Sequence, residues 1–249
     1  MSGMVICGGD FPAEQALSDL AAATERLIGA SSVLSDAAVR EASLLPGWTR
    51  GHVLSHLARN AEGGTRLLGW ARTGVPSYEY ESLQARAAAI EAGAGRPAAV
   101  LVDDVRRTAA AFAGAAAGMP PPAWRRVVRY TAGQEPLAEV IVPSRLAEVL
   151  IHHVDLDIGF RPADWPASFV SGLLPVLVSD LNGRAGQMRA TRLSASDTGR
   201  AFAIGALTPR SPKVTGPEHE LLAWLLGRSA GPRLDREPAG PLPDVPAIY

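Results

Sequence analysis

The sequence predicts an α+β protein in which an N-terminal up-down four-helix bundle is followed by a small C-terminal α/β domain. In the first two-thirds of the 249 residues, four long segments carry apolar residues at helical spacing. After the stretch "GFRPADWP" the pattern changes to a helix, several short β-like runs and another helix. We therefore assign residues 10–163 to the bundle and residues 164–249 to the second domain.

The bundle helices are predicted from apolar periodicity and from residues that begin or end helices. Thr49 is a suitable N-cap for the second helix, and Pro97 stands where the third begins, before a triple proline ends it. Moderate connections between long helices favour an up-down arrangement. The expected helices lie at residues 13–31, 50–71, 97–119 and 144–159, with a shorter helical patch at 81–93.

Shorter elements are expected outside these helices. Before the last bundle helix, "WRRVVRY" and "LAEVIVP" are predicted as two short strands joined through "TAGQEP". In the second domain, a helix over residues 166–184 precedes the β-like runs "TRLSAS", "AFAIG" and "PKVTG". A helix within "GPEHELLAWLLGRSAG" and an extended Pro-rich tail complete the prediction.

Composition argues against several classes of function. The 24 basic and 25 acidic residues are balanced, so neither a nucleic-acid surface nor a polybasic membrane anchor is expected. No apolar run approaches the roughly 20 residues that span a bilayer, and the Gly-rich start lacks the features of a signal peptide. Cys7 is the only cysteine, and we interpret it as part of a loose tail rather than as a nucleophile. We expect a cytoplasmic protein.

Histidines and one glutamate are the candidate metal ligands. Glu148 and His152 stand at positions i and i+4 of one predicted helix, and His52 and His56 do the same on another. Facing helices of bundles commonly hold metal ions with such pairs. A single histidine on an apolar helix is more often a core residue, and Glu148 alone could pair with Arg145. Spacing by itself leaves both interpretations open.

Three stretches resemble a known family. "LPGWTRGHVLSHLARNA", "SRLAEVLIHHVDLDIG" and "LLAWLLGRSAG" are together similar to the mycothiol-dependent maleylpyruvate isomerases. The resemblance implies a DinB-like metal-binding four-helix bundle and a small C-terminal α/β domain that is sterol-carrier-like in outline. It also implies a divalent metal, with zinc favoured, and the low-molecular-weight thiol mycothiol as cofactors.

Carried over to this sequence, the family's zinc ligands are His56, Glu148 and His152. Three ligands leave a position open, as in catalytic zinc sites. His52, one turn from His56, is expected to orient a ligand or line the pocket. His153 points about 100° away from His152 on the helix and is not expected in the site. For Asp155, a hydrogen bond near His152 and an exposed or capping role both remain open.

The resemblance also implies two functional arginines, Arg86 and Arg228. A planar guanidinium can bind a carboxylate through two hydrogen bonds, which suits an anionic substrate. Because Arg228 lies in the second domain, this assignment implies an active site between the domains. Each arginine, considered without the resemblance, would be an ordinary solvent-exposed or capping residue.

The family converts maleylpyruvate to fumarylpyruvate, a cis-to-trans change about a conjugated double bond. Addition of a thiolate makes this bond single, rotation follows, and elimination returns the thiol. Metal coordination deprotonates a thiol that is otherwise mostly protonated at neutral pH. The same apparatus would serve an S-transferase that conjugates an electrophile, because the two reactions differ only after the addition. A third hypothesis is a non-catalytic small-molecule binding protein.

Overall fold

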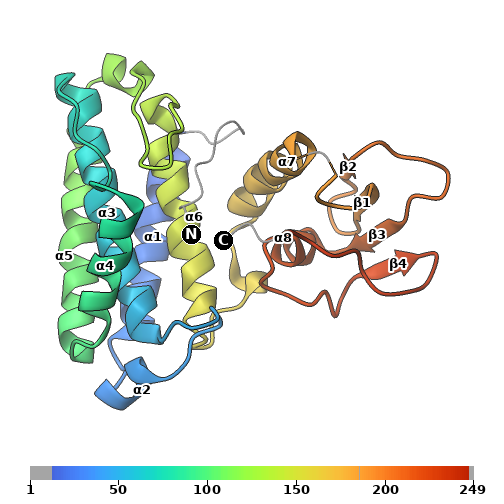
Figure 1. The fold of residues 1–249 in the computed structure, drawn as a ribbon, viewed down its shortest axis with the longest axis horizontal. Helices are drawn as coiled ribbons and strands as arrows, with labels where there is room; N and C mark the ends of the chain where they lie inside the picture. Colours follow the sequence, from blue (N-terminus) through green and yellow to red (C-terminus); the bar gives the residue numbers. More distant parts are fainter. Residues whose placement is uncertain (1–12, 185, 247–249) are drawn as a thin grey trace. The chain divides into compact units, whose positions relative to one another are not determined.

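The computed structural model describes residues 13–184 and 186–246. These residues form two compact units, the first ending at Phe160 and the second beginning at Arg161 (Figure 1). This division lies close to the predicted one between residues 163 and 164. Cys7 lies outside the described residues. Among the described residues, no helix combines the length and apolar character that crossing a membrane requires.

Four long helices build the first unit, as predicted. In the part of the chain described, α1 contacts α5 and α6, and α3 contacts the same two helices, so the four close into a bundle. The shorter α4 packs on α3. The helices are α1 (Ala13–Ser31), α2 (Asp36–Arg40), α3 (Arg50–Thr73), α4 (Leu83–Ala94), α5 (Ala98–Ala117) and α6 (Ile141–Asp155), with the 3-10 helices η1 (Pro121–Arg125) and η2 (Ala138–Val140) between the last two.

The prediction of two strands before the last bundle helix was wrong. Only an isolated bridge joins Val127 and Leu137. The rest of "LAEVIVP" forms η2 and the first turn of α6, which begins three residues before Ser144. Pro143 fits this first turn, because backbone N–H groups there have no partner within the helix. Every residue of α6 is buried, and this explains why its sequence resembles a core strand.

Two glycines allow α4 to lie close to α3. A Cβ atom at Gly51 of α3 would lie closer to the Ala94 carbonyl oxygen than van der Waals contact allows. A Cβ atom at Gly93 of α4 would collide in the same way with the Ser55 hydroxyl oxygen. The Ser55 hydroxyl donates to the carbonyl of Ile90 at 3.0 Å, which ties the two helices together. Larger residues at either glycine would push α4 away from α3.

A buried carboxylate joins α3, α5 and the loop after α4. Asp104 is 2% exposed and accepts hydrogen bonds from Arg59 at 2.6 Å, Arg96 at 2.7 Å and Arg107 at 2.6 Å. Burial by itself would raise the pKa of Asp104, but the hydrogen bond from Arg96 and the three guanidinium charges hold it below its ordinary value. Asp104 therefore remains ionised at neutral pH.

The second unit is a small α/β arrangement, which together with the bundle confirms the α+β class. The sheet has the strand order β2-β1-β3-β4, in which β1 and β3 are parallel and the other neighbours are antiparallel. Helix α7 contacts β2, and α8 contacts β1 and β3. The elements are η3 (Pro162–Asp164), α7 (Ala167–Gly183), β1 (Thr191–Ala195), β2 (Ala201–Ile204), β3 (Lys213–Gly216), α8 (Glu218–Leu225) and β4 (Asp235–Glu237). The edge strand β4 was not predicted, because its three residues are all charged.

Replacing Gly51 with alanine is expected to destabilise the protein by about 1–3 kcal/mol, because the new methyl group must displace backbone of α4. At Gly69 on the same helix, a Cβ atom would have no neighbouring atom within 4 Å, so Gly69→Ala is the matched control. This control should stabilise the protein by roughly 0.5–1 kcal/mol through the higher helix propensity of alanine. Urea unfolding of both variants measures the difference, and equal stability of the two would contradict the packing argument.

Replacing Asp104 with asparagine is expected to lower the free energy of unfolding by about 1–3 kcal/mol at neutral pH. This range includes a reduction for solvent screening, because the three arginines are partly exposed. The pKa of Asp104 is lower in the folded protein than its ordinary value of 3.8. Its contribution is therefore complete above that pH and is lost as the pH falls through the folded-state pKa. Asp104→Asn should thus lose less stability on acidification than the wild type, measured by urea unfolding. The exposed Asp103→Asn is the control, and it should behave as the wild type does.

Candidate metal centre

The start of α3 is fixed by a capping box. The Thr49 hydroxyl accepts the backbone N–H of His52 at 3.3 Å, and His52 Nδ1 in turn accepts the backbone N–H of Thr49 at 3.1 Å. The other ring nitrogen, Nε2, lies 3.1 Å from the exposed carboxylate of Glu91 on α4. Both nitrogens of His52 are therefore engaged at the helix start. This explains why His52 does not join His56 in one ligand set.

His56 stands one turn further along α3 and is fully enclosed. Its side chain is 1% exposed, and the ring of Trp48 packs edge-on against it with centroids 5.7 Å apart. Trp48 also stacks on His52, so it separates the two histidines from solvent on this side. Arg86 of α4 places Nη2 3.2 Å from His56 Nδ1. Because arginine can only donate, Nδ1 accepts and Nε2 carries the hydrogen in this arrangement.

On α6, Glu148 and His152 lie one turn apart, and Asp155 follows. All three are buried, at 1%, 3% and 0% exposure. His152 Nδ1 lies 2.8 Å from Asp155 Oδ2, so that Nε2 turns toward Glu148. This is the arrangement in which a carboxylate orients a metal-ligating histidine. The role left open for Asp155 by the sequence is therefore contact with His152.

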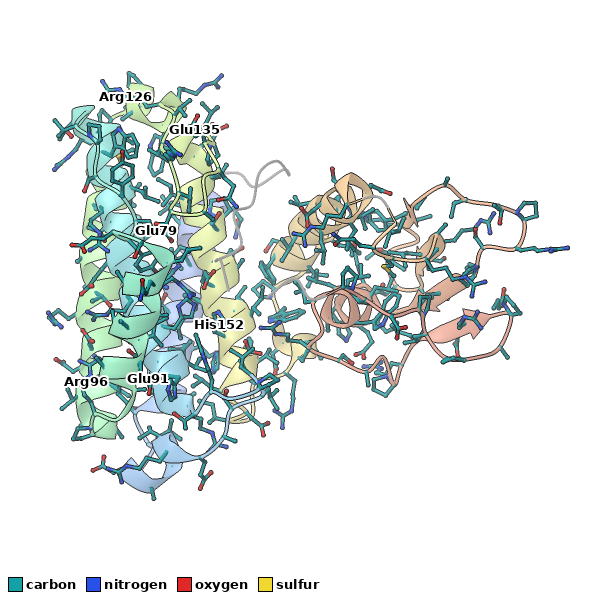
Figure 2. All side chains as sticks on the ribbon, viewed as in Figure 1. Glu79, Glu91, Arg96, Arg126, Glu135 and His152 are labelled. Atoms are coloured by element: carbon teal, nitrogen blue, oxygen red, sulfur yellow. The ribbon has the colours of Figure 1, made fainter. Side chains whose placement is uncertain are left out.

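The ligand atoms of the two helices converge on one point. Glu148 Oε2 lies 2.7 Å from His56 Nε2 and 3.3 Å from His152 Nε2, and the two nitrogens are 3.0 Å apart. Ligand atoms from all three side chains lie within 4.8 Å of one another. Figure 2 shows His152 between the two ends of the bundle, which are marked by Glu91 and Arg96 and by Arg126 and Glu135. The group therefore lies inside the bundle.

The two histidines of the group differ in their pKa, because burial lowers that of both rings but hydrogen bonds to Asp155 and Glu148 raise the pKa of His152 above its ordinary value. Burial lowers the pKa of His56 to about 4, which leaves the ring neutral as coordination requires. Burial alone would raise the pKa of Glu148, but its interactions with the imidazoles of His56 and His152, hydrogen bonds among them, hold it well below its ordinary value. The second oxygen of Glu148, Oε1, is buried without a hydrogen-bond partner. Two imidazoles and one carboxylate form a donor set of catalytic zinc sites, so the residues fit such an ion.

Two family models match the chain. The model described as the mycothiol maleylpyruvate isomerase N-terminal domain matches residues 20–157, and the model for the C-terminal domain of the same family matches residues 164–247. The chain belongs to the mycothiol maleylpyruvate isomerase family. The resemblance inferred from the sequence motifs is thereby confirmed, and the chain is a member of an enzyme family.

Solved structures of this family share the fold. The crystal structure of the mycothiol-dependent maleylpyruvate isomerase is 25% identical, with a TM-score of 0.85 over 96% of this chain and 98% of that chain. A structure of a histidine-to-alanine mutant under the same enzyme name is 24% identical, with a TM-score of 0.86 and the same coverage. Comparison with proteins of curated function gave no match.

The structure brings some of the residues implied by the family resemblance together. Arg86 is 7% exposed and contacts His56, and its guanidinium lies 5.8 Å from the centre of the Tyr80 ring. Arg228 belongs to the second unit, where its Nη1 donates to the carbonyl of Leu226 at 2.9 Å, and its assigned role stays a prediction. His153 stacks on Phe160 with ring centroids 4.1 Å apart and is not part of the ligand group, as helix geometry predicts.

Glu79 is a buried acidic residue near Glu148 that the sequence analysis missed. It lies in the loop between α3 and α4, yet it is only 9% exposed. A Cβ atom at Gly63 of α3 would lie 2.7 Å from Glu79 Cγ, so this glycine allows the loop to approach the helix. Arg66 and Thr131 bind the backbone of the loop at Glu79 and Tyr80. No sequence motif signals this placement, because every partner comes from a distant segment.

Proposed function

We propose that this protein is a metal- and mycothiol-dependent cis–trans isomerase of maleylpyruvate or a similar unsaturated dicarboxylate, acting by reversible thiolate addition. The observation that carries the proposal is the buried group of His56, Glu148 and His152, whose ligand atoms converge from two helices. Family membership supplies the thiol and the substrate class. The partners are thus a small anionic or electrophilic molecule and a low-molecular-weight thiol.

We propose that His56, Glu148 and His152 hold a zinc ion or a similar divalent metal. When bound, the ion would lower the pKa of the thiol and so supply thiolate at neutral pH. Asp155 fixes the ring of His152, and burial keeps His56 neutral. Coordination through His56 Nε2 would require the ring hydrogen to move to Nδ1, which would end the donation from Arg86. Burial also excludes water, which strengthens every electrostatic interaction inside the site.

Arg86 supplies positive charge beside the ligand group. Its guanidinium lies next to His56, so it is placed to bind a substrate carboxylate and to stabilise the enolate that thiolate addition creates. We assign Arg228 the same kind of role from the family resemblance alone. We assign His52 a positioning role, because its Nδ1 accepts from Thr49 at the start of α3 and its Nε2 lies 3.1 Å from Glu91 on α4.

A mycothiol S-transferase is the second candidate, and Glu79 is the feature that favours it. Isomerisation consumes no proton overall, because the thiol that adds is later released. Conjugation instead requires a proton donor for the carbanion that addition leaves behind. Burial raises the pKa of Glu79 to about 7, and the charge of Glu148 adds to this effect. Near neutral pH, a large fraction of Glu79 is therefore protonated and able to donate.

The purified protein is expected to contain one divalent metal ion per chain. His56→Ala and Glu148→Ala should each abolish binding, since each removes one of three ligands. His153→Ala is the matched control, because it changes the neighbouring histidine of the same helix without touching the ligand group. Elemental analysis of the four proteins gives the answer. Full metal retention in both ligand variants would show that the metal binds elsewhere.

Incubation of the protein with mycothiol and maleylpyruvate tests the reaction. The isomerase is expected to form fumarylpyruvate while the thiol concentration stays constant, measured by chromatography and a thiol assay. Stoichiometric loss of thiol would identify the transferase instead, and in that case Glu79→Gln should slow product formation by removing the proton donor. The absence of any change in thiol or substrate would contradict both functions.

A further inference from the structure

A small cavity with both polar and apolar lining lies beside Glu148 and Arg145. Its volume is about 20 Å³, which is enough for one water molecule. Residues of α3, α5 and α6 and of the Glu79 loop line it. The polar side chains lining it are Asn60, Glu79, Tyr130, Ser144, Arg145 and Glu148.

Arg145 is the buried cation of this cavity. It lies on α6, one turn before Glu148, and is 4% exposed. Its Nη1 donates to the side-chain oxygen of Asn60 on α3 at 2.7 Å. Its Nη2 is buried and has no hydrogen-bond partner. Burial lowers the pKa of Arg145 to about 10, while the charge of Glu148 opposes this, so the guanidinium remains charged at neutral pH.

Glu148 contributes the matching acceptor. One of its oxygens, Oε2, is shared by His56 and His152, whereas Oε1 is buried without a hydrogen-bond partner. Glu79 lines the same cavity, but burial raises its pKa to about 7, so it is a weaker partner for a cation at neutral pH. A buried donor and a buried acceptor thus share one cavity, and each lacks a partner.

We propose that Arg145 is a positioning residue for Glu148, acting from Nη2 to Oε1 across a cavity with room for one bridging water. Holding Oε1 from behind fixes the rotation of the carboxylate, so that Oε2 stays directed at the histidines. Asn60 holds Arg145 in turn, which connects this support to α3. The inference rests on the proposed function, because it concerns a ligand of the proposed metal site.

Groups that orient metal ligands typically change metal affinity by 10- to 100-fold when they are removed. Arg145→Met should therefore weaken Co²⁺ binding by about 10- to 100-fold. Methionine fills a similar volume without leaving a charge, but it removes the donor to Asn60, so the metal-free protein should unfold at a somewhat lower temperature than the wild type. Arg145→Lys keeps the charge but lacks the planar fork, and it should restore part of the affinity.

The experiment compares wild type, Arg145→Met, Arg145→Lys and the control Arg72→Met, an exposed arginine on α3. Co²⁺ affinity is measured by competition with a chelator, the visible Co²⁺ spectrum reports ligand geometry, and thermal unfolding reports the metal-free fold. Weaker binding with an altered spectrum in Arg145→Met, and affinity partly restored in Arg145→Lys, is the expected result.

Two outcomes would overturn the inference while leaving the metal site intact. The first is wild-type affinity and spectrum in Arg145→Met. The second is weaker binding accompanied by an equal loss of thermal stability in both Arg145 variants, which would make Arg145 a purely structural residue. Failure of the wild type to bind Co²⁺ would instead contradict the proposed function, and the inference would fall with it.

Discussion

Burial of one carboxylate between two imidazoles is the constraint on which the rest of the helical unit depends. Glu148 Oε2 lies within 3.3 Å of ring nitrogens of His56 on α3 and His152 on α6, and all three side chains are buried. Such a group is costly to bury unless its partners are held in place. The capping box at Thr49 holds His56, and Asp155 holds His152. Contacts at the start of α3 and near the end of α6 therefore both help to hold the two histidines around Glu148.

Close packing of α4 against α3 adds a positively charged side chain to this arrangement. The absence of side chains at Gly51 and Gly93 brings α4 against α3, and Arg86 on α4 thereby reaches His56. A guanidinium on a long side chain acts at a defined point only if the backbone that carries it is held in place. The two glycines hold the backbone of α4 in place by allowing it to pack against α3. Packing, rather than any local motif, therefore determines that a cation stands beside the ligand group.

The sequence predicted the features that depend on local spacing. The helices and the i, i+4 pair on α6 follow from periodicity and were found, although α6 spans Ile141–Asp155 rather than residues 144–159. Periodicity could not choose between His52 and His56, because they share one helix face; the choice came from the family resemblance. The structure separates them through the capping box, in which His52 is the third residue. Glu79 lay beyond prediction, because its burial depends on Gly63 and Arg66 of α3 and on Thr131 of the loop before η2.

Charge balance among the buried side chains explains why the proposed site would select anions. Glu148 and Asp155 contribute two negative charges and Arg86 and Arg145 two positive ones, so these four groups sum to zero. Asp155 and Glu148 raise the pKa of His152 against the effect of burial, so the metal-free group already attracts positive charge. A divalent cation would bring a larger positive charge than the proton it displaces. Uncompensated charge in a buried site is unfavourable, and an incoming thiolate or dicarboxylate reduces it. With a divalent ion bound, a preference for anions would thus arise from the charges buried in the bundle.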